Sequence, residues 1–253
     1  MNQERLEEKM WQVAGLREER GKEKEALEMA DSLLKEIEKE NGGAKLEAQV
    51  WLEKSLIWQH LLESRMSEGN QGVDEARNEM MMAIKQAEMV MEDGGVDRGD
   101  ETLRIDVFLG KAAMEVDDYE GAKQAYERAI EVVNDETKTL EFKAHLCEPV
   151  ILLGEVKEGV RLAQQTDGEF DEGVGEELKN GDYITWAIWK SGLWIRVAKA
   201  LKKVGKLAEY EELVMGKLTE AEEYLNEDKI ETKKWTEKPF EIRLDQIKEI
   251  REK

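Results

Sequence analysis

The sequence predicts an all-α protein in which helical hairpins stack side by side into a right-handed α-solenoid. The first observation is composition: 38% of residues are charged, mostly Glu and Lys, and there are only two prolines, which is typical of helix-forming chains. The second is a frame of small residues that recurs along the chain. The third is that glycines follow these small residues at the distance expected for turns between helices.

In the recurring frame, a small residue at a helix crossing follows a bulky or aromatic residue by four positions and precedes a turn by about seven. Gly or Ala at such a crossing lets two helices approach to about 8 to 10 Å. The frame occurs five times, and successive crossings are 47, 48, 37 and 51 residues apart. It places five hairpins in a repeat domain over residues 1–228, at about 4–41, 44–91, 102–135, 138–166 and 182–226.

The first hairpin has Trp11 beside a crossing at Ala14 and Gly15, with its turn at Gly21. Trp58 holds the same place in the second hairpin. The second helix of that hairpin carries a methionine cluster that we expect to fill its core, composed of Met80, Met81, Met82, Met89 and Met91. Residues 90–101 then read as a linker between helices.

The third hairpin is the clearest copy, with Leu109 and Gly110 facing Ala122. Asp117 and Glu120 stand at capping-box spacing, so we expect them to begin the second helix. That helix has an apolar stripe with a helical period, made of Tyr119, Ala122, Tyr126, Ala129 and Val133.

The fourth crossing falls at Leu146 and Cys147, which predicts a buried and unreactive thiol at Cys147. An acidic stretch with four glycines, residues 167–182, reads as an exposed loop. The fifth crossing follows Trp194. Residues 229–253 are predicted to be a linker and a C-terminal capping helix, because a solenoid end otherwise leaves an apolar face in water.

This frame resembles the tetratricopeptide-repeat (TPR) family, most closely over residues 103–134. The resemblance implies a non-catalytic scaffold or adaptor that binds a peptide or helix of another protein on a concave face lined by the first helices of the hairpins. The alternative is a regulator that senses a peptide or ligand and transmits a shape change to a partner. The implied lining is Gln59, Arg104, Val107, Lys111, Met114, Glu141, Glu148, Ile195, Lys199 and Lys202, with Trp186 and Trp189 as aromatic contacts.

Charge is unevenly distributed in this chain, whose net charge is -21. Residues 92–182 hold 25 acids and 10 bases, whereas residues 183–253 hold 14 acids and 15 bases. Because nucleic-acid binding depends on clustered cations, the acidic middle argues against a nucleic-acid partner. A basic stretch from Arg196 to Lys206 suggests either a grip on an acidic peptide or self-association with the acidic middle of another copy.

The sequence offers little for catalysis. Its two histidines, His60 and His145, lie 85 residues apart. Glu141, His145 and Glu148 share one helix face, which favours a solvated polar surface over a divalent-metal site. No nucleotide-binding motif and no membrane-spanning apolar run occurs. We therefore expect no enzyme activity, no cofactor and no bound metal, and a cytoplasmic location without a membrane contact.

Overall fold

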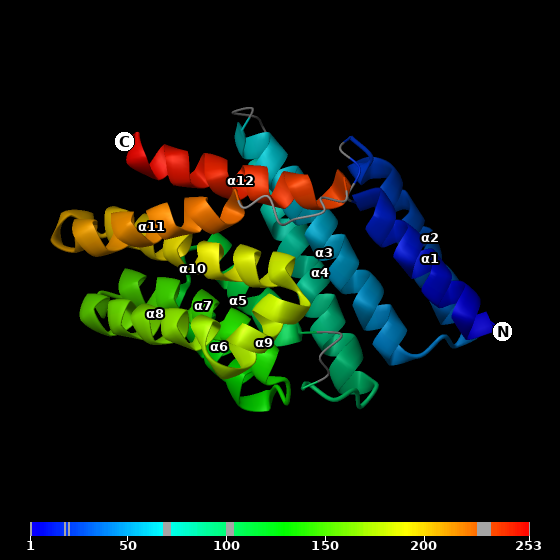
Figure 1. The fold of residues 1–253 in the computed structure, drawn as a ribbon. Coiled ribbons are helices and arrows are strands. Elements are labelled where there is room, and N and C mark those ends of the chain that lie inside the picture. The colour runs from blue at the N-terminus through cyan, green and yellow to red at the C-terminus, as the bar shows by residue number, and fades with distance from the viewer. Residues whose placement is uncertain are drawn as a thin grey trace. The chain divides into compact units, whose positions relative to one another are not determined.

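The computed structural model describes residues 2–17, 19, 21–67, 72–99, 104–226 and 234–252, and every regular element within these ranges is a helix (Figure 1). The prediction of an all-α protein is therefore confirmed for the described part of the chain. None of the helices described there has the length and the apolar character needed to cross a membrane. The chain forms two compact units, residues 1–117 and 118–253, which are described in turn.

Helices of the first unit pack in chain order, each on the next, and the first also packs on the third. Apolar residues three or four positions apart give a helix one buried stripe. In the second helix this stripe consists of Ala26, Ala30, Leu33 and Ile37. The helices are α1 (Asn2–Arg17), α2 (Glu23–Glu40), α3 (Ala44–Ser67), α4 (Val73–Asp93) and α5 (Ile105–Glu115).

The methionine cluster of α4 is divided between core and surface. Met80 and Met91 are buried, as expected, but Met82 and Met89 are exposed. Because Met82 and Met89 are seven residues apart, they lie on one face of the helix, opposite the buried stripe. The prediction that all five methionines fill the core was wrong for these two.

Arg98 ties the segment after α4 to the start of α5. Its guanidinium donates two hydrogen bonds to the buried carboxylate of Asp106, both at 2.9 Å, and one to Glu88 at 2.7 Å. The Asp106 side chain raises the pKa of Arg98, although partial burial opposes this shift. The predicted linker over residues 90–101 thus begins inside α4 and contains an anchored arginine.

The second unit is organised around α10 (Tyr183–Lys203), whose buried residues lie on nearly all sides of the helix. It packs on α7, α8, α9, α11 and α12. Because neighbouring helices surround it, α10 carries apolar residues on nearly all sides. The other elements are α6 (Tyr119–Val132), α7 (Glu136–Leu152), α8 (Val156–Asp171), α9 (Gly173–Gly181), η1 (Leu207–Tyr210), α11 (Glu211–Leu225) and α12 (Lys234–Arg251).

Aspartates begin three helices of the second unit. Asp118, Asp135 and Asp182 each accept hydrogen bonds from backbone amides in the first turn of α6, α7 and α10, which satisfies donors that have no partner within the helix. The capping residue of α6 is therefore Asp118 and not Asp117, as the capping-box spacing had suggested. Asp117 adopts a positive φ of 57° in the turn just before it.

The acidic stretch over residues 167–182 is helical, so its prediction as an exposed loop was wrong. The helix α8 continues to Asp171, and α9 follows after one residue. Asp167 and Phe170 are buried, and cations from α10 and α11 bind the acids. Lys217 Nζ lies 2.9 Å from Asp167, and Lys190 Nζ lies 2.5 Å from Asp171.

The division between the units falls inside the predicted third hairpin, between α5 and α6. The helix α5 packs on α4 in the first unit, and α6 packs on α7 in the second. In the fourth hairpin, the crossing of α7 and α8 is close. A Cβ added to Gly159 would lie 2.4 Å from Ile151 Cγ1 and 3.2 Å from the backbone oxygen of Cys147.

Candidate functional site

A cluster of three cations lies where α7, α10 and α12 of the second unit meet. We call Arg196 and Lys199 of α10 together with Arg243 of α12 the cationic cluster. A Cβ added to Gly192, one turn before Arg196, would lie 3.1 Å from Arg196 Nη1 and 3.1 Å from Arg243 Nη2. Both guanidinium groups thus cover the same glycine, which leaves room for them because it has no side chain.

The helices that carry the cationic cluster are held by their apolar stripes. On α10, Trp194, Val197, Ala198 and Leu201 are buried, and on α12 Phe240 and Ile247 are buried in the same core. Arg243 is three residues after Phe240 and four before Ile247, so it lies at the edge of the buried face of α12. The apolar residues that hold α12 in the core therefore also determine where Arg243 lies.

Hydrogen bonds to neutral oxygens help to orient both arginines of the cluster. Arg196 Nε donates to the backbone oxygen of Ala144 in α7 at 3.3 Å, and Arg243 Nη1 donates to the side-chain oxygen of Gln246 at 3.0 Å. Both acceptors are neutral, so these bonds orient the guanidinium groups without cancelling their charge. Two like charges around one glycine are unfavourable unless anions balance them.

Burial and neighbouring charges act in opposite directions on two cations of the cluster, Arg196 and Lys199. Desolvation lowers the pKa of Lys199, and the nearby Arg243 and Arg196 lower it further, while Glu148 and Glu249 act in the opposite direction. Burial likewise lowers the pKa of Arg196, with Glu148 as the largest opposing influence. Lys199 has an exposed side chain, yet enough protein surrounds its ammonium for desolvation to be the leading cause. Glu148 therefore favours the charged forms of both Arg196 and Lys199, whereas burial disfavours them.

An aromatic and acidic group borders the cluster on α6 and α7. The ring of His145 stacks on that of Tyr126, with centroids 5.4 Å apart and planes 21° from parallel. His145 Nε2 lies 3.8 Å from Glu141 Oε1, and Glu141 is buried. Within the described residues, no group of three or more His, Cys, Asp and Glu side chains is arranged to hold a metal ion.

The structure brings together part of the binding face that the sequence predicts. Glu148 and Lys199 belong to the cluster and its border, as does Glu141, and Lys202 is exposed further along α10. Ile195 is buried in the core of the second unit. A peptide on the surface of α10 would not contact Ile195, so its assignment to the lining conflicts with its burial.

The predicted lining residues of the first unit differ in accessibility. Val107 is buried and therefore packs in the core of that unit. Gln59, Arg104, Lys111 and Met114 are half-buried, and the ammonium of Lys111 lies 5.9 Å from the ring centroid of Phe108. Four of the five residues thus reach the surface of the unit.

Of the two predicted aromatic contacts, Trp186 is a core residue. It is 2% exposed and its indole nitrogen donates to the backbone oxygen of Phe170 at 2.8 Å. Trp189 is half-buried and packs against the same core. The prediction of Trp186 as an aromatic contact of the binding face therefore conflicts with its burial, because α8 and α9 cover it.

Sequence reasoning found Arg196 and Lys199 as a basic stretch but missed Arg243 and Glu249. The signal for Arg243 was available in the apolar stripe of the C-terminal helix, which places position 243 beside the buried face. No sequence pattern connects that position with Gly192, which is 51 residues away. Only the packing of α12 on α10 brings them together.

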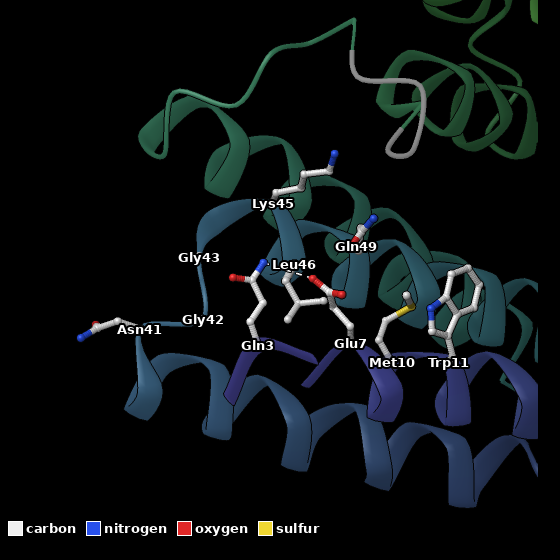
Figure 2. A pocket seen from close by; sticks show the side chains of 10 residues that line it. All are labelled: Gln3, Glu7, Met10, Trp11, Asn41, Gly42, Gly43, Lys45, Leu46 and Gln49. Carbon is white, nitrogen blue, oxygen red and sulfur yellow. Dashed lines mark hydrogen bonds between the residues drawn. The ribbon is translucent and has the colours of Figure 1, made fainter. Parts of the chain in front are cut away.

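A second surface feature lies in the first unit, where Trp11 stands over an open groove of about 340 Å³ between α1 and the start of α3 (Figure 2). Trp11 is 69% exposed, so the expectation that it packs at a helix crossing was wrong. We call this the Trp11 groove; it is lined by Gln3, Glu7, Met10, Trp11, Asn41, Gly42, Gly43, Lys45, Leu46 and Gln49.

Comparison with known proteins assigns no family to this chain. No family model matches the sequence, and no curated protein is significantly similar to it. The chemistry of the cationic cluster is therefore the basis for a functional proposal.

Proposed function

We propose that this chain is a non-catalytic interaction protein of the TPR-like solenoid type, acting in the cytoplasm as a scaffold or adaptor. Its second unit binds an acidic segment of another protein, a peptide or a helix, across α7, α10 and α12. The observation that carries this proposal is the crowding of Arg196 and Arg243 around Gly192, with Lys199 beside them.

The helix contacts support a repeat architecture. Within the second unit, α7 packs on α8 and α10 packs on α11, as in successive hairpins. The first helices of these pairs, α7 and α10, also pack on each other. In a stacked series of hairpins, such contacts form the row of helices that lines the binding face.

An acidic partner is favoured because an anion beside Lys199 would favour its charged form and oppose the effect of burial. The pKa of Lys199 is lowered, which means that its surroundings disfavour the charged form. A carboxylate placed beside it would stabilise the ammonium and both guanidinium groups, and the planar guanidinium groups can each donate two hydrogen bonds to one carboxylate. The same charges would repel a basic segment.

The test uses fluorescence anisotropy with a labelled helix-forming peptide that carries four glutamates, and with its glutamine counterpart. We expect the glutamate peptide to bind more tightly, and Lys199→Gln and Arg243→Gln each to weaken binding by up to about fivefold, since a partly exposed ion pair contributes about 0.2 to 1 kcal/mol. Lys24→Gln is the control, because Lys24 is 91% exposed and lies in the other unit. Equal binding of both peptides would exclude the proposal.

The pH dependence provides a second measurement. Because the pKa of Lys199 is lowered from 10.5, the lysine loses its proton at a lower pH than an ordinary lysine. Affinity for the glutamate peptide should therefore fall earlier on the alkaline side than it does for Lys199→Arg, whose guanidinium stays charged. Identical pH profiles of the wild type and Lys199→Arg would show that Lys199 does not contact the peptide.

A further inference from the structure

We propose that the Trp11 groove binds a cationic side chain, Lys or Arg, presented by a basic segment of a partner protein. This surface lies in the first unit and is separate in chemistry from the cationic cluster. The proposal rests on the exposed indole, the carboxylate that accompanies it and the way this chain uses its other tryptophans.

The indole of Trp11 is open to solvent. Large aromatic side chains are usually buried or partnered, whereas Trp11 is 69% exposed at the edge of the groove. Below it, Met10 and Leu46 are buried and form an apolar floor. The aliphatic stem of a lysine or arginine could lie on such a floor while its charged end stays near water.

A carboxylate lies one turn from the indole on the same helix. Glu7 is four residues before Trp11, it lines the groove, and it is exposed. Gln3 Nε2 donates to Glu7 Oε1 at 3.1 Å (Figure 2), which orients the carboxylate and leaves its charge intact. Glu8, also exposed, is three residues before Trp11 on the same helix but does not line the groove.

The two basic residues in the first half of α1 are paired with α2. Arg5 donates to Glu40 at 2.6 Å, and Lys9 donates to Glu36 at 2.6 Å, so both cations pair with α2. The one cation that lines the groove is Lys45, whose ammonium points away from Glu7 in Figure 2. Glu7 and Trp11 therefore present a negative carboxylate and the electron-rich face of an indole, a combination that attracts a cation.

Some other tryptophans of the chain have a cation of the same chain close to the ring, and one of them, Trp186, is a core residue. Among the described residues, cations lie over three tryptophan rings: Lys54 over Trp51 at 4.4 Å from the centroid, Arg65 over Trp58 at 5.9 Å, and Lys179 over Trp186 at 4.5 Å. No cation from the described residues is found over Trp11 in this way. Its exposure and the adjacent Glu7 favour a cation supplied by another molecule.

The test follows the indole N–H signal of Trp11 by NMR, assigned by its loss in Trp11→Phe. The probe is an eight-residue peptide with two arginines, compared with the same peptide carrying citrulline, which has the same shape without the charge. We expect the arginine peptide to shift the Trp11 signal in a saturable way at low salt. An equal shift by the citrulline peptide would overturn the proposal.

Variants that remove a charge from the groove test whether it prefers cations or anions. Glu7→Gln should weaken arginine-peptide binding by about two- to fivefold, whereas Lys45→Gln should strengthen it by removing a repulsive charge. The reverse order would mean that the groove prefers anions, contrary to the proposal. Met82→Ala is the control for loss of an exposed apolar side chain, because Met82 lies on α4 and outside the groove.

A second copy of the chain is the alternative occupant. If the Trp11 signal moves with protein concentration when no peptide is present, and the arginine peptide causes no further change, the groove is a self-association surface and the proposal is wrong. A concentration-independent signal that responds only to the arginine peptide supports a basic partner.

Discussion

Asp167 is expected to be the most sensitive polar residue of the second unit. The residue is 5% exposed. It accepts a hydrogen bond from Trp194 Nε1 at 2.9 Å and forms ion pairs with Lys217 at 2.9 Å and with Lys190 at 3.7 Å. One side chain of α8 thereby connects α10 and α11 through buried polar groups of α10 and a partly exposed lysine of α11.

The cost of Asp167→Ala can be worked out from these contacts. The indole N–H of Trp194 is left buried without an acceptor, which costs about 1 to 3 kcal/mol. Lys217 is partly exposed and regains water, and Lys190 keeps its ion pair with Asp171. The expected loss is therefore about 3 kcal/mol, at the lower end of the range for breaking a buried pair. Asp167→Asn keeps an acceptor for the indole and should cost about half as much.

Amide hydrogen exchange of α10, measured by mass spectrometry, is the appropriate assay. It reports the opening of the unit that contains Asp167, even if the two units unfold separately. Glu220→Ala is the matched control, because Glu220 also pairs with Lys217 but is 54% exposed, and it should cost less than about 1 kcal/mol. If Asp167→Ala costs no more than Glu220→Ala, the reasoning about burial is refuted.

Three further predictions concern buried positions. Burial raises the pKa of Cys147 to about 12, so iodoacetamide should label this thiol at pH 8 in urea but not in the native protein. The free energy of unfolding should fall above about pH 9, because only the unfolded thiol ionises there. Rapid labelling of the native protein would contradict this. Asp106→Ala removes two hydrogen bonds of Arg98 and leaves the one to Glu88, so it should lower the stability of the first unit by about 1 to 3 kcal/mol. Hydrogen exchange of α5 measures this loss, and an unchanged exchange rate would contradict it. Gly159→Ala should lower the stability of the second unit by about 1 to 3 kcal/mol in thermal unfolding, because the added Cβ meets Ile151. Gly15→Ala, whose Cβ would have no atom within 4 Å, should stabilise the first unit slightly. Equal effects of the two substitutions would argue against a close crossing of α7 and α8.

Helices and turns were readable from the sequence because their causes are local. Apolar residues at a period of 3.6 indicate a helix, and glycine indicates a turn where φ must be positive. Gly21, Gly154 and Gly205 follow the first, fourth and fifth crossings, and all three adopt positive φ. Each of these turns depends on a few neighbouring residues, which the sequence displays in order.

The acidic stretch after α8 could not be read in this way. Glycine and acids favour an exposed loop by local criteria, but Phe170 is buried in the core and Asp167 binds groups from α10 and α11. Those partners lie 27 and 50 residues further along the chain. Their contribution outweighs local propensity, and it becomes visible only when the helices are packed.

Trp11 shows the same difference between pattern and packing in the opposite direction. The crossing frame places Trp11 and Gly15 at a helix contact, yet Trp11 is exposed and a Cβ on Gly15 would meet nothing within 4 Å. At Gly159 the same frame coincides with a close contact. A small residue permits close approach but does not enforce it, because the neighbouring helix must also present a complementary surface. This is why the frame predicted that helices pair but did not predict which surfaces remain open, and the open surfaces are the ones available for binding.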